Sequence, residues 1–80
     1  MNEYSSLSLA VIIRALEDVQ GGNGERRDAE KFLKDDDELF FFIEVGQLEL
    51  KTYRIRNGMH DRRKNKRMIG DLRRLRQAAL

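Results

Sequence analysis

A short run of cationic side chains is the part of this sequence with the clearest chemical use. Five positive charges fall within six residues, at Arg62, Arg63, Lys64, Lys66 and Arg67. Guanidinium and ammonium groups at such close spacing suit the neutralisation of successive phosphates along a nucleic-acid strand. The run therefore predicts a polyanionic partner, and we take DNA as the first candidate.

The charge of the whole chain is divided in the same direction. Residues 1–45 contain eleven acidic and five basic side chains, whereas residues 46–80 contain three acidic and eleven basic ones, although the net charge is only +2. Such a division favours binding of a polyanion by the second half. The alternative is that the basic residues form a solvated face that only balances the acidic half.

Composition argues against catalysis and against a bound metal. Cysteine is absent and His60 is the single histidine, so thiolate nucleophiles and zinc or iron sites built on cysteine are excluded. The acidic run 35–38 lacks the glycine and the spacing of an EF-hand loop. It is more typical of a helix cap than of a divalent cation site. The adjacent His60 and Asp61 have no nucleophile near them in the sequence. We expect a protein that is not an enzyme and that needs no cofactor or metal.

The apolar runs are too short to cross a membrane. The longest, Leu9–Ile13 and Leu39–Ile43, have five residues each, against roughly 20 for a spanning helix. The first residues, Asn2, Glu3 and Tyr4, do not resemble a secretory signal. We therefore expect a cytoplasmic protein without a membrane partner.

Two helices are predicted in the first half. Apolar residues recur at three- and four-residue spacing over 6–20, with Ser5 or Ser6 as a possible N-cap and residues 21–24, three of them glycine, at the end. A second helix is predicted from about Gly24 to Lys34. It would turn Ala29, Phe32 and Leu33 inward, and then Asp35 and Glu38 would form a capping box for the next element.

Residues 39–56 are ambiguous between helix and strand, because 39–45 is apolar nearly all round. A hairpin turning at Gly46 and Gln47 would give an α+β fold. We favour helix, turn, helix, since Leu50 and Tyr53 share a helical stripe while the alternation expected of a strand fails. In this interpretation Phe40, Phe41 and Phe42 form the hub of the core, and Gly46 and then Asn57-Gly58 close the two helices.

The last segment, 60–80, is predicted to be a basic C-terminal helix. Its first half is polar, and its second half carries an apolar stripe of Met68, Ile69, Leu72 and Leu75. Gly70 lowers its helix propensity by about 1 kcal/mol relative to alanine, so the helix needs a surface to pack against. Together these elements predict an all-α fold, a compact bundle of four to five short helices in one domain, 1–80.

The order of several residues resembles that of a group of small phage and prophage proteins. The residues concerned are Ala10-Val11-Ile12, Ala15, Asp18, Ala29, Leu33, Phe42, Leu48, Tyr53 and Arg54. The resemblance covers 9–56, with Phe32 where that group usually has tryptophan and with acids in place of a Pro-Gly-Ser before the third helix. It implies a phage or prophage origin, a bacterial cytoplasm as location and a compact fold with a helix-turn-helix-like arrangement, but no chemistry.

Two functions follow as hypotheses. In the first, a helix-turn-helix presents Lys51, Thr52 and Arg56 to a groove of DNA, while the five cations between Arg62 and Arg67 hold phosphates. This helical wheel places Leu50 and Tyr53 in the core, Ile55 outward and Arg54 nearer the packed side. In the second, the stripe from Met68 to Leu75 pairs with another helix, in a homodimer or on a host protein. The alternative for that stripe is that it closes the core of its own chain.

Overall fold

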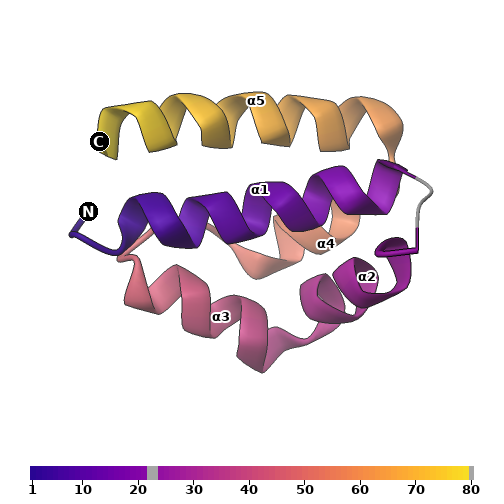
Figure 1. Ribbon diagram of the computed structural model, residues 1–80, viewed down its shortest axis with the longest axis horizontal. Coiled ribbons are helices and arrows are strands. Elements are labelled where there is room, and N and C mark those ends of the chain that lie inside the picture. Colours follow the sequence, from indigo (N-terminus) through magenta and orange to yellow (C-terminus); the bar gives the residue numbers. More distant parts are fainter. Residues whose placement is uncertain (22–23, 80) are drawn as a thin grey trace.

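Among the residues that the structure describes, helix α1 (Ser5–Gly21) packs against three of the other four helices (Figure 1). A computed structural model describes residues 1–21 and 24–79, apart from the side chain of Asp36. The helices that follow α1 are α2 (Arg26–Lys34), α3 (Asp36–Val45), α4 (Thr52–Gly58) and α5 (Arg62–Ala79). The residues described contain no strand, so the prediction of an all-α fold is confirmed and the hairpin alternative is wrong.

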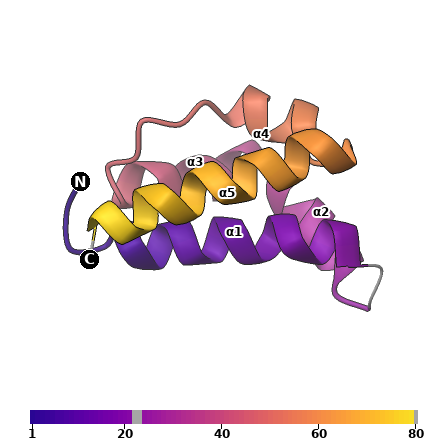
Figure 2. The same ribbon diagram turned by 90° about the horizontal axis from the view of Figure 1, so that it is seen from above.

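The longest helix, α5, lies antiparallel to α1 along one side, while α2 and α3 pack on the other side (Figure 1). The short α4 sits beside α5 and follows an extended connection from α3 (Figure 2). Because α1 separates α3 from α5, these two helices have no packing contact with each other. The acidic α3 and the basic α5 are therefore on opposite sides of the molecule.

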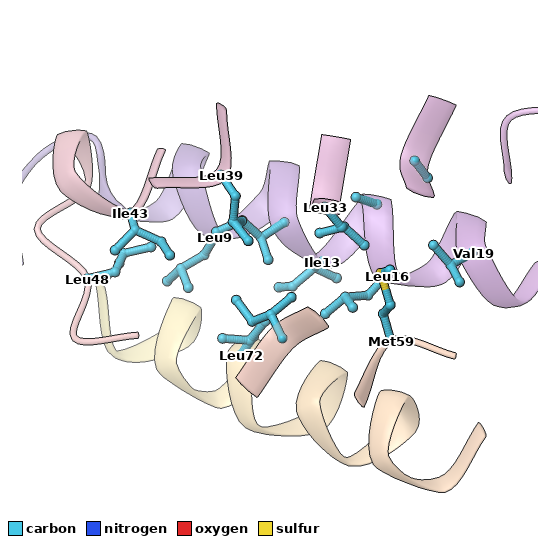
Figure 3. Close-up of a cluster of buried hydrophobic side chains, with 14 residues drawn as sticks. Leu9, Ile13, Leu16, Val19, Leu33, Leu39, Ile43, Leu48, Met59 and Leu72 are labelled. Atoms are coloured by element: carbon cyan, nitrogen blue, oxygen red, sulfur yellow. The ribbon is translucent and has the colours of Figure 1, made fainter. Parts of the chain in front are cut away.

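The core is built on the apolar stripe of α1 that the sequence predicted. Leu9, Ile12 and Leu16 are completely buried, and Val19 is nearly so. Apolar residues from the other helices and their connections pack on this stripe. Figure 3 shows Leu33, Leu39, Ile43, Leu48, Met59 and Leu72 around it. Burial of each large aliphatic side chain stabilises the fold by roughly 1.5 to 3 kcal/mol. The predicted inward residues of α2 are confirmed for Ala29 and Leu33, and Phe32 is half-buried.

The prediction that Phe40, Phe41 and Phe42 form the hub of the core is wrong. Leu39 and Ile43 are the buried residues of α3, whereas Phe40 is 53% and Phe41 58% exposed. A helix buries positions four apart, and an all-apolar run offers several such pairs without marking one of them. Here the aliphatic pair faces α1, so the two aromatic rings project into solvent.

The predicted orientation of α4 is also wrong. Ile55 is buried and Tyr53 is 57% exposed, which reverses the two faces that were expected. Residues two apart lie about 200° apart around a helix axis, so choosing the wrong one turns the whole helix over. The helix begins at Thr52, and Leu48 and Leu50 of the preceding connection join the core.

Gly46 closes α3, as predicted, but the left-handed residue of the turn is Gln47 and not the glycine. Gly46 has helical angles, and Gln47 takes the left-handed conformation with φ of 51°. The N–H groups of Leu48 and Gln47 donate to the carbonyls of Ile43 and Glu44 at 2.8 and 3.0 Å, the pattern of a Schellman motif. Gly46 is required for another reason, since a Cβ there would lie 2.8 Å from the Cβ of Ser8 on α1.

Residues at the start of the chain form hydrogen bonds with the end of α3, and no serine caps the start of α1. The buried hydroxyl of Ser5 donates to the carbonyl of Gly46 at 2.6 Å, and the side chain of Asn2 donates to the carbonyl of Val45 at 3.0 Å. The carbonyl oxygens left without partners at the end of α3 are thereby satisfied. Neither Ser5 nor Ser6 therefore acts as the predicted N-cap.

Half of the predicted capping box forms at the start of α3. The carboxylate of Asp35 accepts the N–H groups of Asp37 and Glu38 at 3.0 and 3.1 Å, which confirms its role as N-cap. The N–H of Asp35 donates to the carbonyls of Lys31 and Phe32 at the end of α2, so Glu38 does not serve it. At the end of α1, Gly22 and Asn23 of the predicted glycine connector lie outside the residues described.

Candidate nucleic-acid interface

One buried polar residue fixes the position of the basic helix. Asn65 lies within the cationic run, yet its side chain is only 1% exposed. Its amide donates two hydrogen bonds, to the carbonyl of Leu16 at 3.0 Å and to that of Met59 at 2.8 Å. The amide of Gln20 donates to the same Met59 carbonyl at 3.0 Å. The corner between α4 and α5 is thus tied to the end of α1.

The buried position of Asn65 could not be predicted from the sequence, because the residue stands in a run of polar residues that is typical of a solvated segment. The only signal was its spacing from Leu72, which is seven residues away and therefore on the same face of the helix. With Asn65 and Leu72 turned toward α1, the remaining residues of the run must point away from the core.

The five predicted phosphate contacts are all exposed in this arrangement. They are Arg62, Arg63, Lys64, Lys66 and Arg67. No carboxylate among the residues described forms an ion pair with any of them. Their charge is therefore accessible at the surface.

The cations in the second half of α5, by contrast, interact with side chains of the same chain. Arg73 pairs with Glu17 of α1 at 2.8 Å, and Arg74 pairs with Asp71 one turn earlier. Arg76 donates to the hydroxyl of Ser6 at 3.1 Å. The basic helix therefore has a proximal part with unpaired charges and a distal part whose charges are largely used within the chain.

An open groove of about 450 Å³ lies between α4 and α5. Its apolar lining comes from Leu50, Ile55, Met68 and Leu72, and two pairs of cations line it, Lys51 and Arg54 from the α4 side and Lys64 and Arg67 from α5. Glu49 and Asp71 are the acidic residues of the lining, and Asp71 is the partner of Arg74. The groove brings together one predicted contact of 51–56, Lys51, and two of the cationic run, Lys64 and Arg67, and it adds Arg54.

The three predicted groove contacts of 51–56 are therefore not equivalent. Lys51 is exposed at the N-cap position of α4, whereas Thr52 and Arg56 are half-buried. Arg54, which the predicted helical wheel turned toward the core, is exposed. Both differences follow from the reversed orientation of α4. Because Ile55 faces the core, Thr52 and Arg56 are turned toward the protein and Arg54 is turned toward solvent.

The first turn of α5 is electrostatically unusual. It contains Arg62, Arg63 and Lys64 and no acidic residue, although the N-terminal end of a helix dipole favours negative charge. Only the cap is acidic: the carboxylate of Asp61 accepts the N–H of Lys64 at 3.0 Å. This hydrogen bond, supported by the charges of Lys64 and Arg63, lowers the pKa of Asp61 below its ordinary value of 3.8.

His60 and Asp61 do not face a common reaction centre. The Nδ1 atom of His60 lies 3.9 Å from a carboxylate oxygen of Glu30 on α2. A hydrogen bond from Arg26 is the main reason why the pKa of Glu30 is lowered, and His60 adds to it. The carboxylate of Asp61 accepts a hydrogen bond at the start of α5, so His60 and Asp61 interact with different partners.

The apolar stripe of α5 packs on its own chain. Leu72 belongs to the buried core, and Met68, Ile69 and Leu75 are half-buried against it. This placement corresponds to the alternative in which the stripe closes the core of the monomer. It also supplies the packing surface that a helix containing Gly70 needs.

Comparison of the chain with protein-family models, with curated proteins and with solved structures gives no match. The resemblance to small phage proteins stays a prediction. Within residues 1–21 and 24–79, no helix is long and apolar enough to cross a membrane. No group of three carboxylate, thiol or imidazole side chains in that part of the chain could hold a metal ion.

Proposed function

We propose that this protein binds nucleic acid, duplex DNA in the first place, through the proximal half of α5 and the cationic groove between α4 and α5. The observation that carries the proposal is the set of five exposed cations between Arg62 and Arg67 that pair with no carboxylate among the residues described. A surface of this kind gains free energy when phosphates replace the small counterions around it.

The start of α5 supports the same assignment. Three cations in the first turn oppose the helix dipole and so destabilise the free protein. A phosphate bound there would be attracted by these three charges. The unfavourable arrangement in the free protein becomes favourable in the complex.

The groove suggests how a strand would lie. Lys51 and Arg54 line it from one helix and Lys64 and Arg67 from the other, so a sugar–phosphate backbone along the groove would have cations on both sides. The half-buried Thr52 and Arg56 are poorly placed to read base edges, and α4 has only seven residues. We therefore propose contacts mainly with phosphates, which give little sequence specificity.

Two matched double variants on the same helix test the proposal. Arg63→Ala/Arg67→Ala removes two unpaired charges, and Arg73→Ala/Arg74→Ala removes two charges that are paired within the chain. We expect the first variant to weaken binding to a DNA duplex at least tenfold at 100 mM salt, and the second to weaken it much less. Fluorescence anisotropy of a labelled duplex measures both affinities.

Reversal of charge separates binding from folding. The triple variant Arg63→Glu/Lys64→Glu/Arg67→Glu should lose DNA binding and keep its helical circular dichroism, since acidic residues near a helix start suit the dipole. Equal losses of affinity in the two double variants, or unfolding of the triple variant, would contradict the proposal.

A regulatory protein interaction is the second candidate, as a homodimer or on a host protein. Because the stripe of α5 packs on its own core, such a contact would need another surface. The phage or prophage origin and the cytoplasmic location likewise rest on the sequence alone.

A further inference from the structure

The outer face of α3 carries an unusual combination of exposed side chains. Asp37, Phe40, Phe41 and Glu44 are all exposed, and their spacing of three, four and seven residues places them on one stripe of the helix. We call these four residues the α3 stripe. Two adjacent phenylalanines that are each more than half exposed are costly in water, and such patches mark sites of interaction.

The ring of Phe41 in the α3 stripe packs on another aromatic ring of the same protein. The ring of Phe41 packs edge-to-face on Phe42, with centroids 5.5 Å apart, and Phe42 packs in the same way on Phe32 of α2 at 5.6 Å. This series of rings runs from the surface to a residue packed against the core. Phe41 is thereby held in place, so less conformational entropy is lost when a partner covers it.

The acidic part of the stripe is unpaired. No cation among the residues described forms an ion pair with Asp37 or Glu44. The neighbouring Glu38 is exposed and also makes no ion pair in this part of the chain. The aromatic pair is therefore bordered by negative charge at both ends of the stripe.

This charge pattern selects the partner. Two copies of the chain packed through their α3 stripes would bring like charges together, which opposes a symmetric dimer. Pairing of α3 with the basic α5 of a second copy would join opposite sides of the molecule, and such head-to-tail contacts build larger rings or open filaments instead of closed dimers. A different protein with a cationic apolar surface has neither difficulty.

We propose that the α3 stripe docks a cationic amphipathic helix of another protein. The apolar ridge of that helix covers Phe40 and Phe41, and its lysine or arginine side chains pair with Asp37 and Glu44. The α3 stripe is on the opposite side of α1 from α5, which carries the five exposed cations of the candidate nucleic-acid interface, and neither proposal depends on the other.

Two synthetic helical peptides test this proposal. Both have the same leucine ridge and a single tryptophan, but one carries lysines and the other glutamates on its polar face. Because the protein contains no tryptophan, the emission of the peptide reports binding directly. We expect the lysine peptide to bind and to perturb the amide signals of α3 in NMR spectra, and the glutamate peptide to bind at least tenfold more weakly.

Variants of the stripe assign the two contributions. Phe40→Ser/Phe41→Ser should weaken binding of the lysine peptide at least tenfold while DNA binding is retained. Asp37→Lys/Glu44→Lys, which leaves both rings in place, should reverse the preference and favour the glutamate peptide. Tyr53→Ser, which removes an exposed ring on α4, is the matched control. It should change the affinity for neither the lysine peptide nor the glutamate peptide.

Three results would overturn the proposal. One is that both peptides bind wild-type protein equally well, and another is that the lysine peptide perturbs a surface other than α3. The third is a wild-type dimer in sedimentation equilibrium that becomes a monomer in Phe40→Ser/Phe41→Ser, which would show that a second copy occupies the stripe.

Discussion

Asn65 is the single polar side chain on which the position of α5 depends most. Its amide makes two hydrogen bonds, and the residue is only 1% exposed. We expect Asn65→Ala to lower the free energy of unfolding by about 1 to 3 kcal/mol, because two bonds are lost in a buried place. Asn65→Asp should cost more, since a carboxylate would then face two carbonyl oxygens.

Urea denaturation followed by circular dichroism measures these changes. Gln77→Ala, at an exposed position of the same helix, serves as the control and should change the free energy by less than about 0.5 kcal/mol. Equal stabilities of Asn65→Ala and the wild type would mean that the two hydrogen bonds do not hold α5 in place.

Gly46 and Gln47 should respond in opposite directions to substitution. Gln47→Gly relieves a left-handed conformation and should stabilise the protein by about 0.5 to 1 kcal/mol. Gly46→Ala forces a methyl group to 2.8 Å from the Cβ of Ser8 and should destabilise it by about 1 to 3 kcal/mol. Thermal unfolding of both variants checks the signs, and a stabilised Gly46→Ala would disprove the close approach of α3 to α1.

At the scale of the helices, the sequence was sufficient wherever periodicity was clear. The stripe of α1 and the inward residues of α2 follow directly from spacing. The faces of α3 and α4 could not be predicted, because their apolar residues are adjacent or alternate and fit more than one helical wheel. Which of Phe40 or Leu39, and which of Tyr53 or Ile55, is buried depends on tertiary packing.

The cap of α5 should make the stability depend on acid pH. The pKa of Asp61 is lowered in the folded protein, so its ionised form stabilises the fold above the ordinary value of 3.8. That contribution is lost as the pH falls below 3.8 and through the lowered pKa. Asp61→Asn keeps a capping oxygen that does not titrate, so its melting temperature should fall less than that of the wild type between pH 5 and pH 2.

Asp61→Ala is the companion variant for this cap. It removes the oxygen that accepts the N–H of Lys64 and should lower the melting temperature already at pH 7. Identical acid dependence in the wild type and in Asp61→Asn would show that Asp61 does not contribute to the loss of stability in acid.

At the scale of the whole molecule, the fold converts a division along the sequence into a division in space. The acidic α3 and the basic α5 end up on opposite sides of α1 (Figure 1). The cationic run itself could be predicted as a site from the sequence. The distinction between its unpaired half and its paired half could not, because the pair of Glu17 and Arg73 joins residues 56 apart in the chain.

The dependence of DNA binding on salt tests the proposed function most directly. If about five phosphates are neutralised, the logarithm of the binding constant should fall against the logarithm of the salt concentration with a slope of about −4 to −5. Arg63→Ala/Arg67→Ala should reduce that slope by about 2, and Arg73→Ala/Arg74→Ala should reduce it much less. A slope near zero, or no binding at 50 mM salt, would contradict the assignment of the proximal half of α5 as a nucleic-acid interface.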